Sequence, residues 1–96
     1  MPSAMSEADA RERLASVPGW ELDGARLQRT YGFDSYTAGV AFANRVAELA
    51  EQANHHPDIL IGYRKVTLTL TSHDAGGLTS RDFEVTSGAW HETPRD

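Results

Sequence analysis

The chain has 96 residues, a formal net charge of −5 and no cysteine, which predicts a single domain over residues 1–96 with loose ends at 1–5 and 92–96. Without cysteine the chain has no disulfide, no thiolate metal site and no thiol nucleophile, so we expect a protein of the reducing cytoplasm. An acidic chain without a cluster of Lys and Arg is not expected to bind nucleic acid, and its apolar runs fall far short of the roughly 20 residues that cross a membrane.

The first predicted elements are a short helix over residues 6–17 and a β-hairpin over residues 20–33. Ser6 can cap the helix, and the Pro18-Gly19 pair ends it. The hairpin is predicted because two short strand-like runs flank the turn signal Asp23-Gly24.

The strongest periodicity of the chain lies over residues 34–56. Apolar residues recur there at helical spacing, as in a helix packed on a sheet: Phe42, Val46, Leu49 and Ala53. Asp34 or Ser35 can cap the start of this helix. Pro57 ends it, because the residue before a proline is disfavoured in the α conformation. We therefore expect the pair His55-His56 in the last turn.

A second hairpin and a final helix follow. Residues 58–73 alternate in strand fashion, with apolar side chains on one side and threonines on the other side of the second half, and with a bend near Arg64-Lys65. A capping box over residues 79–82 then opens a helix that extends to about Trp90. The order α-β-β-α-β-β-α predicts an α+β fold, with a four-stranded antiparallel sheet and three helices packed mainly on one face.

Three of the four histidines, His55, His56 and His73, lie near the ends of these elements. Active sites often form at such ends, and imidazole can exchange protons near cellular pH. Glu51 lies four residues before His55, a spacing at which its carboxylate can bond the imidazole and fix the tautomer. The histidines are therefore candidates for acid–base catalysis.

Two other interpretations of the histidines compete with catalysis. In the first, the adjacent pair is a polar helix end whose imidazoles interact with the helix dipole and the loose carbonyls. In the second, three histidines form a zinc site, but neither His-x-x-x-His nor His-x-His occurs in the chain. Spacing alone favours metal-free acid–base catalysis only modestly.

A larger motif surrounds the histidines: Glu51, His55-His56-Pro57, Tyr63, His73 and Asp82, with "TSHDAGGLTSRD" around the third histidine. In residue type and spacing the motif resembles the signature of the pterin-4a-carbinolamine dehydratases. A weaker resemblance runs through "GWELDG" and "YGFDSYTAGVAFANRVAELAE" and so covers most of the chain. The family's fold, a four-stranded antiparallel sheet with three helices, agrees with the element order above.

The resemblance implies an activity: family members dehydrate 4a-hydroxytetrahydropterins to quinonoid dihydropterins in tetrahydropterin recycling. It implies that His55 and His73 are the acid–base pair and that His56 orients the substrate or shares the acid role. Four further residues become candidates for binding the pterin: Glu51, Asn54, Ser72 and Arg81. No metal and no cofactor are expected. Three other residues are expected to be structural or solvated: Tyr63 and Leu70 in the core, and His91 near the end of the last helix.

Other features leave room for a different role. Asn54 replaces an acidic residue of the animal members, and Ile59 replaces a tryptophan near their pocket. Asp82 fits the motif, but its position as the third residue of a capping box is an equally good explanation. An alternative function is a non-catalytic binding or assembly module on the same fold. In either case we expect dimers or tetramers, because a small sheet with an uncovered face or edge must hide it.

Overall fold

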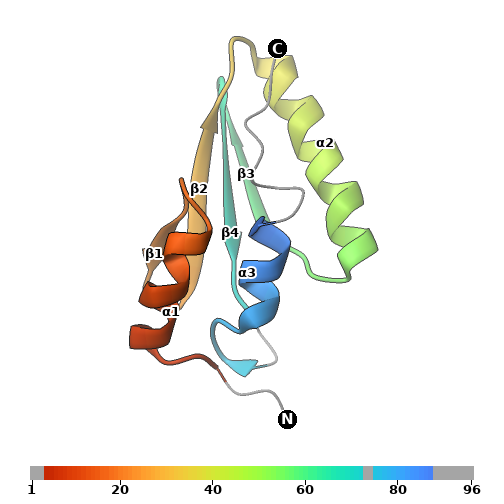
Figure 1. Ribbon diagram of the computed structural model, residues 1–96. Helices are drawn as coiled ribbons and strands as arrows, with labels where there is room; N and C mark the ends of the chain where they lie inside the picture. The colour runs from red at the N-terminus through yellow and green to blue at the C-terminus, as the bar shows by residue number, and fades with distance from the viewer. Residues whose placement is uncertain (1–3, 73–74, 88–96) are drawn as a thin grey trace.

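The computed structural model describes residues 4–72 and 75–87. Within these residues the elements are α1 (Glu7–Arg13), η1 (Leu14–Ser16), β1 (Glu21–Asp23), β2 (Arg26–Gly32), α2 (Tyr36–Ala53), β3 (Asp58–Gly62), β4 (Lys65–Leu70) and α3 (Ser80–Ser87). The strands form one antiparallel sheet in the order β1-β2-β4-β3. The helices pack mainly on one side of this twisted sheet (Figure 1), and the predicted α+β fold is confirmed.

Serine caps begin the first two helices, as the sequence predicts. Ser6 and Ser35 each accept a hydrogen bond of 3.1 Å from the backbone N–H three residues later. Ser35 rather than Asp34 is therefore the cap of α2. The helix expected over residues 6–17 is α-helical only as far as Arg13, because the chain then tightens into the 3₁₀ turn η1.

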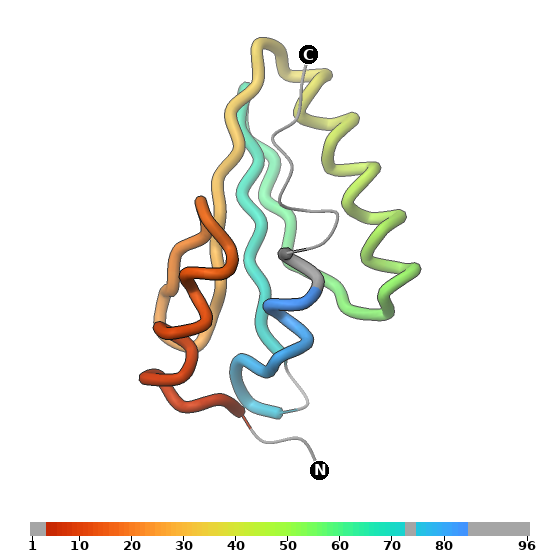
Figure 2. The backbone as a smooth tube through the Cα atoms, viewed as in Figure 1, coloured from red at the N-terminus to blue at the C-terminus, as the bar shows by residue number. Residues whose placement is uncertain are grey.

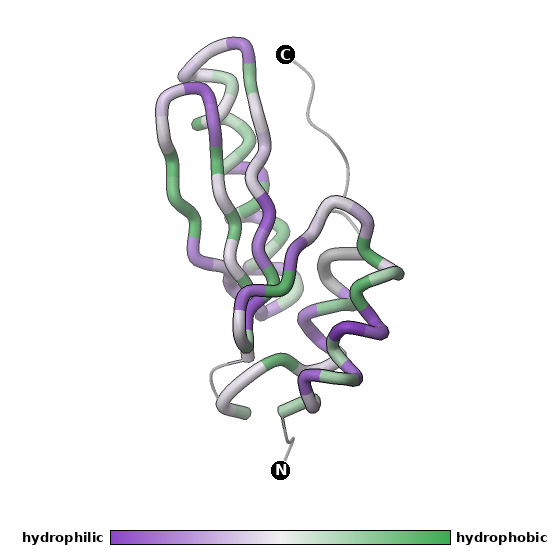
Figure 3. Tube along the Cα trace, turned by 90° about the vertical axis from the view of Figure 1, so that its left-hand side faces the viewer, coloured by the Kyte–Doolittle hydropathy of each residue, from purple (hydrophilic) through white to green (hydrophobic). Residues whose placement is uncertain are grey.

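The core lies between the sheet and the helices, and β4 supplies its centre. Val66, Leu68 and Leu70 are all 0% exposed, as predicted for Leu70. Thr67 and Thr69 between them point to the other face, so apolar and polar residues alternate along the strand (Figure 3). Other strands and helices complete the buried cluster with Leu27, Tyr31, Val46, Ala50 and Phe83, among others.

The opposite face of the sheet is more polar. The hydroxyls of Thr30 and Thr67 form a 2.8 Å hydrogen bond across β2 and β4, and Leu60 of the edge strand β3 is 69% exposed there. The expected burial of Tyr63 is wrong. Its side chain is 75% exposed because the residue lies in the turn between β3 and β4, where Arg64 adopts a positive φ of 63°.

Among the described residues, no helix is both long and apolar enough to cross a membrane. The long helix α2 instead runs beside the sheet and contacts β3 and β4. Its last turn and the first turn of α3 both lie in the lower half of the molecule as drawn in Figure 2. The segment between α2 and β3 carries His55, which contacts Asp82 in the first turn of α3.

Candidate active site

The long helix ends earlier than the sequence predicts. Its last residue is Ala53, and Asn54 adopts the left-handed conformation at φ 52° and ψ 40°. The N–H of Asn54 donates to the carbonyl of Glu51 at 3.2 Å, and the N–H of His55 donates to the carbonyl of Ala50 at 3.1 Å. This pair of bonds is a Schellman motif. The expectation that the histidine pair lies in the last helical turn is wrong, because both histidines follow the helix.

The conformation of Asn54 leads to a stability prediction. We expect Asn54→Ala to lower the free energy of unfolding by about 1 kcal/mol, because alanine disfavours the left-handed region. Asn54→Gly should change it by less than about 0.5 kcal/mol, because glycine enters that region freely. Urea denaturation of the two variants measures the difference. Equal losses from both variants would show that the amide side chain, not the backbone conformation, matters at this position.

His55 is held by a buried carboxylate from another helix. Its Nε2 lies 2.5 Å from Oδ1 of Asp82, in the first turn of α3. His55 is 7% exposed and Asp82 is 0% exposed. The two residues are 27 positions apart in the sequence, so the bond depends on the packing of α3 against the end of α2. The sequence motif contains both residues, but their spacing does not reveal that they touch.

The second oxygen of Asp82 accepts two further hydrogen bonds. The hydroxyl of Ser72 and the backbone N–H of Thr79 both donate to Oδ2, each at 2.9 Å. The bond from Thr79 is the carboxylate half of the predicted capping box, with Asp82 at its third helical position. Ser72 and Thr79 also share a hydroxyl–hydroxyl bond of 2.8 Å. Because the only hydroxyl hydrogen of Ser72 goes to Asp82, Thr79 must be the donor in that bond.

His56 faces the solvent and pairs with Glu51. Its Nε2 lies 2.6 Å from Oε2 of Glu51, and the two side chains are 53% and 77% exposed. The expected bond from Glu51 to His55 is therefore wrong. The left-handed Asn54 turns the chain out of the helical path, so that His55 enters the interior while His56 returns to the last turn of α2.

The structure places the remaining predicted site residues in different environments. Ser72 is 1% exposed and its hydroxyl donates to Asp82, so it supports the buried network. Asn54 and Arg81 are both exposed. His73 and His91 lie outside the described residues. Ser72 and Gly77 exchange backbone hydrogen bonds of 3.0 and 3.2 Å.

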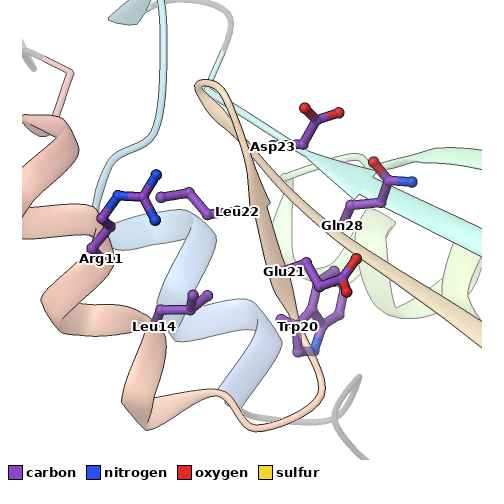
Figure 4. A pocket seen from close by; sticks show the side chains of 7 residues that line it. All are labelled: Arg11, Leu14, Trp20, Glu21, Leu22, Asp23 and Gln28. Carbon is purple, nitrogen blue, oxygen red and sulfur yellow. The ribbon is translucent and has the colours of Figure 1, made fainter.

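An open pocket of about 590 Å³ lies elsewhere, around the edge strand β1. Figure 4 shows its lining residues: Arg11, Leu14, Trp20, Glu21, Leu22, Asp23 and Gln28. It shares no residue with the network around His55. Among the described residues, Nε1 of Trp20 is the one buried polar side-chain atom without a hydrogen-bond partner. The sequence offers no sign of this pocket.

Fold and site together define a small α+β domain with a buried carboxylate–imidazole pair after its long helix and an exposed pair beside it. The family model described as Pterin 4 alpha carbinolamine dehydratase matches residues 3–88. The chain belongs to this family.

Curated relatives cover nearly the same length. A "Putative pterin-4-alpha-carbinolamine dehydratase" of Thermomicrobium roseum is 53% identical over 81 residues, which are 84% of this chain and 87% of the relative. A relative of the same name from Trichormus variabilis is 46% identical over 85 residues, or 88% of this chain and 91% of the relative. The family match over residues 3–88 includes every helix and strand that the structure describes.

Solved structures share the fold. The transcriptional coactivator/pterin dehydratase from Brucella melitensis has a TM-score of 0.78 and 28% identity, with 88% of this chain and 92% of that chain covered. A pterin dehydratase-like protein identified as a RuBisCO assembly factor in the alpha-carboxysome has a TM-score of 0.52 and 23% identity, with 73% and 88% covered. The second likeness concerns the fold alone.

Proposed function

We propose that this protein dehydrates 4a-hydroxytetrahydropterins to quinonoid dihydropterins by histidine acid–base catalysis without a metal, as a step in tetrahydropterin recycling. In this reaction the C4a–O bond breaks and a C=N bond forms between C4a and the neighbouring ring nitrogen. The hydroxyl leaves as water once an acid protonates it, and a base removes the proton from the nitrogen. One acid and one base balance the reaction, and no electrons are exchanged.

The observation that carries the proposal is the pair of oriented imidazoles. His55 and His56 are adjacent in the chain, and each has its Nε2 within 2.6 Å of a carboxylate oxygen. A carboxylate behind an imidazole holds the ring in one orientation and stabilises its protonated form. The two environments differ in burial, which suits different roles for the two imidazoles.

The roles follow the family motif. His55 and His73 form the acid–base pair, and His56 orients the pterin or shares the acid role. Glu51, Asn54 and Arg81 are exposed residues that can contact the substrate. Ser72 contributes through its bond to Asp82.

A glutamine series tests the catalytic assignment. His55→Gln is expected to lower kcat about 10²–10⁴-fold, the usual contribution of a positioned acid or base. Glutamine can still donate a hydrogen bond to Asp82, so the variant should stay folded. His73→Gln should cause a similar loss, and His91→Gln, outside the motif, is the matched control. The measurement is the absorbance decay of freshly generated 4a-hydroxytetrahydropterin, with and without EDTA.

The outcomes separate the candidate functions. Acceleration that EDTA spares and that both motif variants lose supports the dehydratase. Activity that EDTA abolishes contradicts a metal-free mechanism. No acceleration by the folded wild-type protein would favour the alternative, a non-catalytic binding or assembly module on this fold.

Self-association is part of the proposal. In the described sheet β3 is an edge strand, so one side of its backbone has no strand partner there, and Leu60 on it is largely exposed. Pairing of such an edge with a second copy covers both features. We propose a dimer or tetramer as the working form.

A further inference from the structure

The hydrogen bonds around Asp82 determine where His55 carries its proton. Asp82 is fully buried: Ser72 Oγ–H and Thr79 N–H donate to its Oδ2, and Nε2 of His55 lies 2.5 Å from its Oδ1. An ionised carboxylate has acceptor sites only. Nε2 of His55 must therefore carry a hydrogen to bond with it.

The other ring nitrogen of His55, Nδ1, differs from Nε2 in its hydrogen-bond partners. Among the described residues, none forms a hydrogen bond with Nδ1. The His55 side chain retains 9% of its exposure. Within the described part of the chain, Nδ1 is therefore the ring atom that can exchange a proton or bind a polar group.

We propose that Asp82 is a positioning residue that holds His55 in the tautomer with its hydrogen on Nε2, so that Nδ1 is the nitrogen that reacts with the substrate. The assignment of Nδ1 as the reacting atom rests on the proposed dehydratase function. The assignment of the tautomer rests on the buried hydrogen bonds alone. Ser72 and Thr79 act indirectly. Their hydrogen bonds hold the carboxylate of Asp82, and the carboxylate holds the ring of His55.

The two donors at Oδ2 determine how Asp82→Asn would change the tautomer of His55. In Asp82→Asn, the side chain has one acceptor oxygen and one NH₂ donor. Ser72 Oγ–H and Thr79 N–H require the acceptor on their side, which places the NH₂ group against Nε2 of His55. Nε2 must then accept a hydrogen bond, and the ring hydrogen moves to Nδ1. The substitution keeps the shape of the side chain and inverts the tautomer, the effect that the same change has in serine protease triads.

The first measurement is a long-range ¹H–¹⁵N correlation spectrum of histidine-labelled protein at mildly alkaline pH, where unperturbed imidazoles are neutral. His55→Gln identifies the His55 signals by their loss. We expect a protonated Nε2 and an unprotonated Nδ1 in wild type, and the reverse in Asp82→Asn. A hydrogen on Nδ1 in wild type, alone or together with one on Nε2, would overturn the proposal.

The matched control is Asp9→Asn. Asp9 occupies the third position of α1, as Asp82 does in α3, but it is exposed and forms no hydrogen bond or ion pair with either histidine that the structure describes. We expect the His55 signals of the Asp9→Asn variant to match those of the wild-type protein. A tautomer change in this control would show that loss of a helix-capping charge, rather than the contact with His55, alters the ring, and would also overturn the proposal.

The second measurement is steady-state kinetics of Asp82→Asn. We expect kcat to fall about 10²–10⁴-fold with KM within a few-fold of wild type, because the ring stays in place with the wrong nitrogen protonated. Wild-type kcat in a folded variant with the inverted tautomer would refute Nδ1 as the reacting atom. A wild-type protein with the expected tautomer but no dehydratase activity would refute the proposed function and leave the tautomer assignment standing.

Discussion

Asp82→Ala is expected to lower the free energy of unfolding by about 3–5 kcal/mol, the usual loss when one partner of a buried charged pair is removed. The substitution leaves three donors without an acceptor: His55 Nε2, Ser72 Oγ and the backbone N–H of Thr79. It also removes the cap of α3. Because a domain of this size has a total stability of about 5–15 kcal/mol, much of the chain should unfold in mild denaturant.

Chemical denaturation followed by circular dichroism measures this loss. Asp9→Ala is the control, since Asp9 is exposed in the first turn of α1, and its removal should cost less than about 1 kcal/mol. If Asp82→Ala cost no more than this control, the bonds at the buried carboxylate would contribute little beyond an ordinary helix cap.

The second large effect is expected at the centre of the sheet. Leu68 is 0% exposed and lies in register between Arg29 of β2 and Ile59 of β3. Leu68→Ala should lower the free energy of unfolding by about 2–5 kcal/mol, because it removes buried apolar volume and leaves a cavity.

Leu60→Ala is the matched control for the core substitution. It changes the same residue type on the neighbouring strand, but on the face away from the helices, where Leu60 is 69% exposed. The expected change is within about 0.5 kcal/mol in the monomer. Denaturation at two protein concentrations also tests self-association. A loss in Leu60→Ala that grows with protein concentration would show that a second copy covers this residue.

The fold was predictable because its signals are local. Serine caps, the Asp23-Gly24 turn and the alternation of β4 each act within a few residues, and the structure confirms the elements they predict. The burial of Tyr63 was predicted wrongly because alternation continues in sequence beyond Gly62, where β3 has already ended in a turn. A periodic pattern shows which face a residue takes only while the strand lasts.

The site was harder to predict because its contacts depend on one backbone conformation and one distant partner. Asn54 can continue a helix or adopt the left-handed region, and the sequence does not decide between them. Because Asn54 adopts the left-handed conformation, the hydrogen-bond partner of Glu51 is His56 and not His55. The bond from His55 to Asp82 then arises from the packing of α3, a tertiary contact that no local pattern encodes.

The two functions of Asp82 tie the orientation of His55 to the lifetime of a short helix. α3 spans eight residues, and its first turn is closed by the same carboxylate that holds the imidazole. Fraying of this turn is a local opening that needs no global unfolding. Each time it frays, Asp82 moves away and the ring is released to rotate. The fraction of molecules in which Asp82 orients His55 therefore cannot exceed the fraction in which the first turn of α3 is closed.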